Sequence, residues 1–212
     1  MFEPFNYAFM SKCKLLLDAK REFLARCHVI ISENERENFQ TAARKGVQAA
    51  SQRSHLYSPN ATNANKVEIA GYWVERLMAI SEDYKNPQTF CKFLEDVLGL
   101  EKDMNSRFPD MFANGANGAN GYAQKFRLAH AQKSLSVSLK HLWCMDIIPE
   151  PPMCPIDRGI LGKVGVYECW TKLDDVCVYE SWKNAVWKTA SERNMSMSEW
   201  ELTCWNDENV DR

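Results

Sequence analysis

The sequence predicts an all-α fold. Apolar residues recur every three or four positions over most of the chain, as they do when one side of a helix is buried. No segment alternates between apolar and polar residues as a half-buried strand would. The 212-residue chain is 45% hydrophobic and 25% charged, which is the composition of an ordinary globular protein. We therefore expect residues 1–212 to form a single all-α domain, either as one body or as two small lobes around a shared core.

Start signals divide the chain into successive helices. A Ser-x-x-Glu pattern can form a capping box at a helix start, and proline is tolerated in the first helical turn. From apolar spacing we expect helices over 10–31, 67–80, 123–145 and 176–190. From start signals we expect a helix from the Ser32–Glu35 capping box to about residue 52, and another from the Ser196–Glu199 capping box to about residue 205. Two more helices should begin after Asn86-Pro87 and at Asp157.

Bulk composition excludes several classes of protein. The net charge of −2 argues against binding polyanions over the whole surface, but it allows a local basic face. No apolar run reaches the roughly 18 residues of a membrane-spanning helix, and the first residues do not resemble a signal peptide. We expect a cytoplasmic, monomeric protein with reduced cysteines. The eight cysteines form no Cys-x-x-Cys pair and lack zinc-type spacing to histidine, so we expect no metal and no cofactor.

Residues 113–122, ANGANGANGY, form a short Asn-Gly-Ala repeat. Asparagine and glycine favour turns and left-handed backbone, so a flexible loop is the simplest interpretation. Alternatively, successive N–H groups of the repeat form a nest that contacts phosphate. The candidate contacts in that case are Asn117, Gly118, Asn120 and Gly121.

The helix expected over 123–145 has the clearest amphipathic pattern in the chain. One stripe is apolar, and basic side chains lie away from it. We therefore expect a core face and a basic face, and the basic face is either solvated or in contact with DNA. The apolar stripe is Leu128, Ala131, Leu135, Leu139 and Leu142, and the basic residues are Arg127, His130, Lys133, Lys140 and His141.

A proline-rich segment, which we call the strap (residues 147–156), follows that helix. Its four prolines, at 149, 151, 152 and 155, prevent helix formation and predict an ordered, extended connector. Asp157 then stands where the next helix begins. Its carboxylate has two possible roles: it caps the helix by accepting backbone N–H groups, or the strap positions it for chemistry.

Residues 125–161 resemble the core motif of the helix-hairpin-helix DNA glycosylases. The matching stretch reads SVSLKHLWCMDIIPEPPMCPIDRGIL, in which Pro155-Ile156-Asp157 resembles the Pro-Val-Asp of that family. Lys140 lies 17 residues before Asp157, close to the separation of the family's lysine and aspartate, and Lys133 is the second choice. The Leu-x-Gly-Val-Gly hairpin of the family has no match, and the Asn-Gly-Ala repeat is the one glycine-rich element upstream. We take residues 113–165 as the motif-bearing region.

The resemblance implies a fold with two helical lobes around a cleft and an enzyme that excises a damaged or modified base from double-stranded DNA. The base would be flipped out of the duplex, and Asp157 would stabilise the positive charge that develops on the sugar. Lys140 would be the amine nucleophile of an associated AP-lyase activity. A modified cytosine of viral DNA, as in anti-phage defence, is one possible substrate. Candidate DNA contacts are Arg127, Lys133, His141, Trp143 and Arg158.

Two other classes of function fit the same residues. In a non-catalytic helical adaptor, Asp157 would be only a helix cap and the strap a rigid linker. In a different enzyme, the same carboxylate would serve another reaction.

Overall fold

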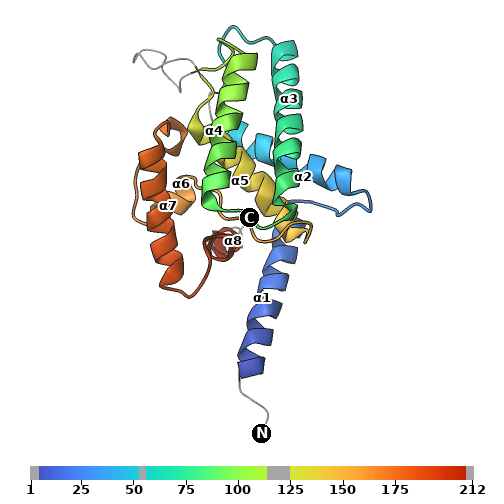
Figure 1. The fold of residues 1–212 in the computed structure, drawn as a ribbon, viewed down its shortest axis with the longest axis vertical. Coiled ribbons are helices and arrows are strands. Elements are labelled where there is room, and N and C mark those ends of the chain that lie inside the picture. Colours follow the sequence, from blue (N-terminus) through green and yellow to red (C-terminus); the bar gives the residue numbers. More distant parts are fainter. Residues whose placement is uncertain (1–4, 53–55, 114–124, 209–212) are drawn as a thin grey trace.

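The computed structural model describes residues 5–52, 56–113 and 125–208, with side chains from residue 13 to 207 within these ranges. Over this part of the chain, the protein has α-helices, two short 3-10 helices and no β-strand, which confirms the all-α prediction (Figure 1). None of these helices has the length and apolar character needed to cross a membrane. The elements are α1 (Phe5–Arg26), α2 (Glu35–Ser51), α3 (Asn63–Glu82), η1 (Asp83–Lys85), α4 (Phe90–Arg107), α5 (Leu128–Cys144), α6 (Arg158–Lys163), η2 (Trp170–Lys172), α7 (Val176–Ser191) and α8 (Met197–Glu208).

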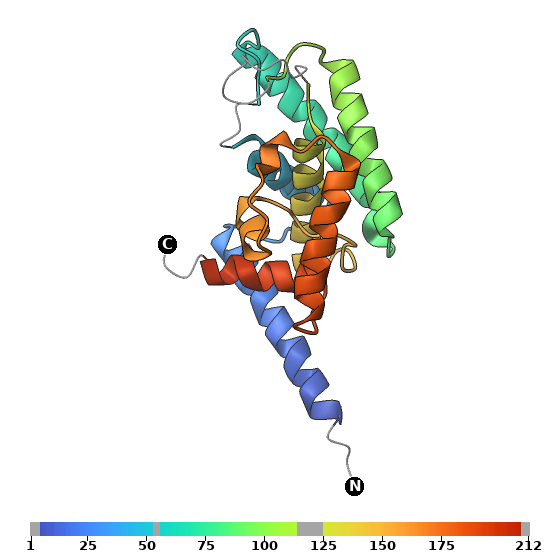
Figure 2. The same cartoon turned by 90° about the vertical axis from the view of Figure 1, so that its left-hand side faces the viewer.

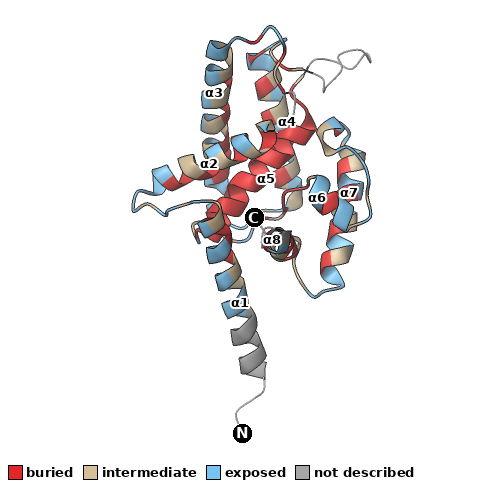
Figure 3. Ribbon diagram, turned by 180° about the vertical axis from the view of Figure 1, so that it is seen from behind, coloured by how far each residue is buried: buried red, intermediate tan, exposed pale blue. Residues whose placement is uncertain are grey.

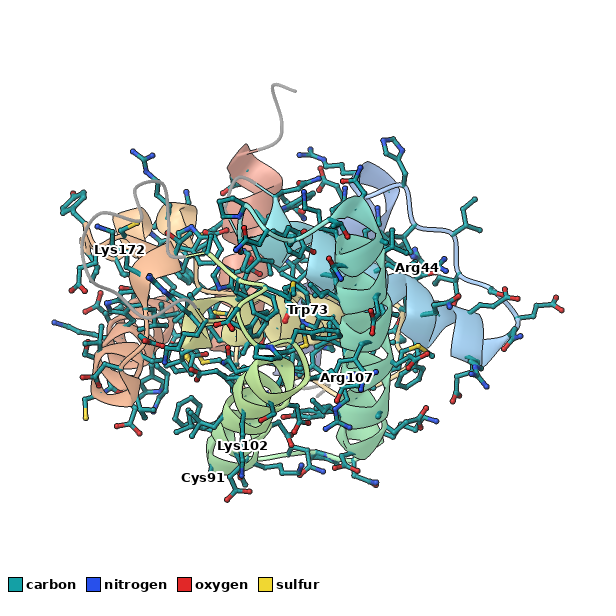
Figure 4. All side chains as sticks on the ribbon, turned by 90° about the horizontal axis from the view of Figure 1, so that it is seen from above. Arg44, Trp73, Cys91, Lys102, Arg107 and Lys172 are labelled. Carbon is teal, nitrogen blue, oxygen red and sulfur yellow. The ribbon has the colours of Figure 1, made fainter. Side chains whose placement is uncertain are left out.

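Helix α5 is the centre of the fold. All 17 of its residues are buried, so it is red along its whole length in Figure 3. Helices α1, α2, α3 and α4 and the short helix η2 pack against it. Helix α2 approaches very closely, since a Cβ atom on Gly46 would lie 2.3 Å from the carbonyl oxygen of Ser134. Trp73 points from α3 toward α5, and its Nε1 donates a hydrogen bond to the Ser134 hydroxyl at 3.0 Å (Figure 4).

The prediction that α5 carries a solvent-facing basic side is wrong. The predicted apolar stripe does lie in the core, but the opposite side of the helix is buried as well. Other helices cover α5 from several directions, and its lysines are accommodated because acidic side chains from later elements meet them inside the fold. The basic residues buried in this way are Arg127, His130, Lys133, Lys140 and His141.

The strap contains no helix, as its prolines predict, and it bends at residues 147, 148 and 152. That the strap is extended stays a prediction. Most of its second half is buried, and two hydrogen bonds hold its backbone. The Ser198 hydroxyl donates to the carbonyl of Pro151 at 3.1 Å, and Gln132 Nε2 donates to the carbonyl of Ile156 at 2.8 Å. The second bond fixes the residue immediately before Asp157 against α5.

Local capping side chains set several helix boundaries. Asn34 caps α2 in place of the predicted Ser32, and Thr89 caps α4, which begins after the predicted Asn86-Pro87 start. The predicted capping box of α8 is present: the backbone N–H of Ser196 donates to the Glu199 carboxylate, and the N–H of Glu199 donates to the Ser196 hydroxyl, both at 3.0 Å.

The amino-terminal part of α1 projects away from the other helices (Figure 2). Toward its carboxyl end, α1 packs against α8 and α5, where Phe23 and Leu24 are buried. Nearer its amino end, Leu15 is 68% exposed and Leu17 is 38% exposed. The carboxyl end of α1 therefore belongs to the core, while its middle presents two leucines to solvent.

Candidate functional site

The structure brings Asp157 together with Lys133, the second choice of lysine from the sequence. Lys133 Nζ lies 2.6 Å from Asp157 Oδ2. The Lys133 side chain is 10% exposed and the Asp157 side chain is 36% exposed, so the pair sits at the edge of the interior. The lysine comes from the central helix α5, and the strap carries the aspartate back to it.

Asp157 is also the amino-terminal cap of α6. Its Oδ1 accepts hydrogen bonds from the backbone N–H groups of Gly159, at 3.0 Å, and Ile160, at 3.2 Å. Burial alone would raise the pKa of this carboxyl, but the ammonium of Lys133 and the two amides outweigh burial and hold the pKa below its ordinary value. The carboxylate is therefore held ionised and in one orientation, with one oxygen on the helix and the other on the lysine.

Lys140 does not lie against Asp157. Its Nζ is 2.6 Å from Glu201 Oε2 of α8, and the two side chains are 4% and 5% exposed. The Lys140 ammonium also lies 4.3 Å from the centre of the Phe23 ring and 5.3 Å from the ring of Trp205. Burial raises the pKa of the Glu201 carboxyl, although Lys140 acts in the opposite direction. Lys140 and Glu201 thus form a second pair, deeper than the first.

A cavity of about 270 Å³ is lined by Lys133 of the first pair and by both members of the second pair, whereas Asp157 is not among its lining residues. Lys133 and Lys140 lie seven residues apart on α5, which places them two turns apart on one side of the helix. The carboxyl of Glu201 feels the charges of Lys133 and Asp157 as well as that of Lys140, so the two pairs are close enough to interact. The cavity is lined by Phe23, Cys27, Lys45, Gln48, Ala49, Gln52, Lys133, Val137, Lys140, His141, Pro155, Glu201 and Trp205.

Two further basic groups shape this cavity. Lys45 Nζ donates to the carbonyl of Cys27 at 2.6 Å, and no carboxylate pairs with it among the described residues. Burial lowers the pKa of His141 to about 3, so its ring is neutral at neutral pH. His141 Nδ1 lies 2.8 Å from the carbonyl of Val137, which can only accept, so Nδ1 carries the proton. His141 Nε2 is then a bare acceptor, buried and without a hydrogen-bond partner in the described structure.

The remaining predicted contacts are scattered. Arg127 is buried and donates to the carbonyl of Thr171 at 3.3 Å. Trp143 is buried, and the Lys20 ammonium lies 4.6 Å from the centre of the Trp143 ring. Neither Trp143 nor Arg127 therefore lies on the surface, as a direct DNA contact would require. Arg158 is exposed beside Asp157. The predicted phosphate contacts Asn117, Gly118, Asn120 and Gly121 lie outside the described residues.

Sequence reasoning missed Glu201, although a signal for it exists. Glu201 lies between Trp200 and Leu202, and Cys204 and Trp205 follow three and four residues later. An acid in such an apolar part of a helix is a buried carboxylate in need of a partner. The sequence does not reveal which lysine meets it.

Nothing in the described residues resembles a metal centre. No three side chains of histidine, cysteine, aspartate or glutamate come together as metal ligands there, and the eight cysteines are free thiols. A larger hollow of about 410 Å³ beside α4 shares no lining residue with the cavity between the two lysine–carboxylate pairs.

The fold and the site define an all-α protein with two neighbouring lysine–carboxylate pairs and a cavity that both lysines line. The sequence matches no family model, and no similar protein was found among curated proteins or solved structures.

Proposed function

We propose that this protein is a DNA glycosylase, which binds double-stranded DNA and excises one flipped-out, damaged or modified base. The observation that carries the proposal is the Lys133–Asp157 pair, whose lysine lines the 270 Å³ cavity. An ionised, oriented carboxylate next to a cavity is what cleavage of a base–sugar bond requires, because the sugar becomes positively charged in the transition state.

Asp157 is the proposed catalytic residue. The C1′–N bond breaks with its electron pair going to the base, and the carboxylate stabilises the resulting charge on the sugar. Water then adds its oxygen to C1′ and passes a proton to Asp157, from which the departing base is protonated. The two backbone amides bind Oδ1, while Oδ2 accepts from Lys133 and is the proposed contact with the substrate.

The cavity is the proposed base pocket. Flipped bases are held between aromatic and apolar walls with polar groups at their edge. Phe23, Trp205 and Pro155 supply apolar walls, and Lys140 and Glu201 supply charged groups. At the rim of the site, Arg158 is exposed and is a candidate phosphate contact.

Lys133 replaces Lys140 as the candidate amine for lyase activity, because Lys133 is the lysine beside Asp157. A Schiff base forms when a neutral amine attacks C1′ of the abasic sugar and water leaves. In the resting pair, the Lys133 ammonium donates to Asp157, so its nitrogen has no free lone pair. We therefore propose that hydrolysis dominates and that strand cleavage requires the Lys133–Asp157 pair to open.

Reduction with borohydride should trap little covalent adduct between the protein and abasic DNA, and any such adduct should disappear in Lys133→Met. An adduct that survives in Lys133→Met but not in Lys140→Met would move the amine to Lys140.

The central experiment incubates the protein with duplexes that each carry one damaged or modified base, including modified cytosines of viral type, and scores abasic sites. Asp157→Asn should lower base release about 100-fold or more, while asparagine keeps the helix cap and the fold. The matched control is Asp146→Asn, because Asp146 also pairs with a lysine, Lys20, at 2.7 Å, but away from the cavity. Full activity in Asp157→Asn would refute the proposal.

A non-catalytic adaptor is the second candidate. The observation in its favour is that Asp157 is already engaged as a helix cap and ion-pair partner, while the middle of α1 exposes Leu15 and Leu17. This candidate would prevail if the wild-type protein produced no abasic site on any duplex and Asp157→Asn changed only stability.

A further inference from the structure

We propose that Lys45, together with Gln48 and Gln52, forms a phosphate-binding site on the open side of the 270 Å³ cavity. The binding of a phosphate group depends only on the charge, exposure and hydrogen-bonding groups of these three side chains. The source of the phosphate rests on the proposed function: it is a backbone phosphate of the DNA beside the flipped nucleotide.

The cavity has more ammonium groups than carboxylates to neutralise them. Three of its lining residues are lysines, and the ion pairs described above neutralise two of them, Lys133 and Lys140. Lys45 is the third, and no carboxylate pairs with it among the described residues. The ring of His141, which also lines the cavity, is neutral at neutral pH and adds no charge. The uncompensated charge of Lys45 therefore favours an anionic ligand.

Lys45 also lies on the accessible side of the cavity. The lining residues that α5 contributes are all buried, whereas those from α2 and its carboxyl-terminal cap are half-buried or exposed. Lys45 is half-buried, and Gln48 and Gln52 are exposed. A ligand that comes from solvent therefore meets these side chains first, and it can bind them without reaching the deeply buried Lys140–Glu201 pair.

The three side chains lie together because of their spacing on the helix. Positions 45, 48 and 52 are separated by three and four residues, which places them on one side of α2. The close approach of Gly46 to Ser134 holds this part of α2 against α5. The three side chains consequently border the cavity along one edge.

These side chains supply the donors that an oxyanion requires. The Lys45 ammonium donates to the carbonyl of Cys27 at 2.6 Å, which leaves two of its three N–H bonds for a ligand. The exposed amides of Gln48 and Gln52 add two N–H donors each. Lysine binds phosphate as a compact point charge. A phosphate group, with its negative charge and several accepting oxygens, can use all three side chains at once.

Inorganic phosphate tests the site without DNA. Phosphate at a tenfold excess over a dissociation constant of about 1 mM should raise the melting temperature of the full chain by about 3–6 °C, relative to chloride at equal ionic strength. Lys45→Met should lose this shift, and Lys45→Arg, which keeps the charge, should retain most of it. The matched control is Lys183→Met, because Lys183 is also half-buried but lies on α7, with its ammonium 4.4 Å from the Phe90 ring.

Duplex DNA tests the source of the phosphate. By fluorescence anisotropy, Lys45→Met should bind a duplex roughly 3- to 10-fold more weakly than the wild-type protein, whatever the sequence. The slope of log affinity against log salt should fall by about 0.9, as expected when one phosphate contact is lost. A substitution that only loosened the fold would not change this slope by one contact. Lys183→Met should leave both affinity and slope unchanged.

Two results would overturn the site itself: no stabilisation by phosphate, or the same stabilisation in Lys45→Met. Stabilisation that needs Lys45, with an unchanged DNA affinity and salt slope in Lys45→Met, would overturn DNA as the source and leave a site for free phosphate. Failure of the proposed function looks different, because the wild-type protein would then release no base from any duplex even though phosphate binds at Lys45. Base release that depends on Asp157, without any effect of phosphate, would keep the glycosylase and remove the phosphate site.

Discussion

Breaking the buried Lys140–Glu201 pair from one side should destabilise the fold strongly. Lys140→Met replaces the ammonium with an apolar group of similar length and leaves the Glu201 carboxylate buried without its partner. The pair is 2.6 Å apart and its two side chains are 4% and 5% exposed, so water cannot compensate the remaining charge. The substitution also removes the contacts that the Lys140 ammonium makes with the rings of Phe23 and Trp205.

The magnitude follows from measurements on buried ion pairs. Removing one partner costs about 3–5 kcal/mol, because the other charge stays in a poorly polarisable environment. For a chain of this size, each kcal/mol shifts the melting temperature by about 2–4 °C. The variant should therefore melt about 6–20 °C below the wild-type protein.

The size of the effect should depend on pH in a defined direction. Burial already raises the pKa of Glu201, and removing Lys140 removes the main group that opposes burial. A carboxyl whose folded pKa lies above its unfolded value loses stability as pH rises from the unfolded value through the folded one. Lys140→Met should thus be closer to wild type near pH 5 than at pH 7, because at lower pH Glu201 is neutralised.

Urea unfolding at both pH values, followed by circular dichroism, measures these differences. The control Asp146→Asn removes the exposed partner of a pair whose carboxylate is 62% exposed and whose lysine, Lys20, is 10% exposed, so it should cost less than Lys140→Met. The double variant Lys140→Met/Glu201→Gln should recover most of the stability lost in the single variant. A loss below about 1 kcal/mol in Lys140→Met, independent of pH, would refute the description of this pair as buried and mutually dependent.

Further outcomes follow from helix packing, capping and titration. Gly46→Ala should cost about 1–3 kcal/mol in urea unfolding, because its Cβ would meet the Ser134 carbonyl oxygen at 2.3 Å, whereas Gly71→Ala, with nothing within 4 Å, should stabilise α3 by about 0.5–1 kcal/mol. Equal effects of the two substitutions would contradict the close approach of α2 to α5. Thr62→Ala should lower stability by about 0.5–2 kcal/mol because it removes the capping box of α3. Since the pKa of Asp157 is lowered in the fold, its ionisation should stabilise the protein above its unfolded pKa of about 3.9, and this contribution should be lost as acid titrates the folded carboxyl. Asp157→Asn should abolish that part of the acid dependence, and an unchanged acid profile would contradict it.

Local sequence signals predicted what depends on neighbours along the chain. Helical spacing predicted the all-α fold, the prolines predicted a strap without helix, and Ser196 with Glu199 predicted the start of α8. These features arise from backbone restrictions and hydrogen bonds within a few residues. The placement of Asp157 at a helix start belongs to the same group.

Features that depend on tertiary packing were predicted poorly. The pattern of α5 is amphipathic, yet nothing in it reveals that other helices cover both of its sides. Lys133 and Lys140 lie on one side of α5, so spacing along the chain could not decide which one meets Asp157. The route of the strap decides it, because the side chain of Gln132 binds the Ile156 carbonyl and so brings Asp157 to the neighbouring Lys133. The two-lobed arrangement around a cleft stays a prediction.

The complete burial of α5 has a consequence for how the chain must fold and unfold. Helices from before it (α1 to α4) and a segment after it (η2) share this one helix as their packing surface. A fragment that ends before residue 128 would leave the inner faces of α2, α3 and α4 without their common partner. The described helices α1 to α4 should therefore be gained and lost together with α5 in one cooperative transition. The same dependence makes the connections on either side of α5 poor places to cut or permute the chain.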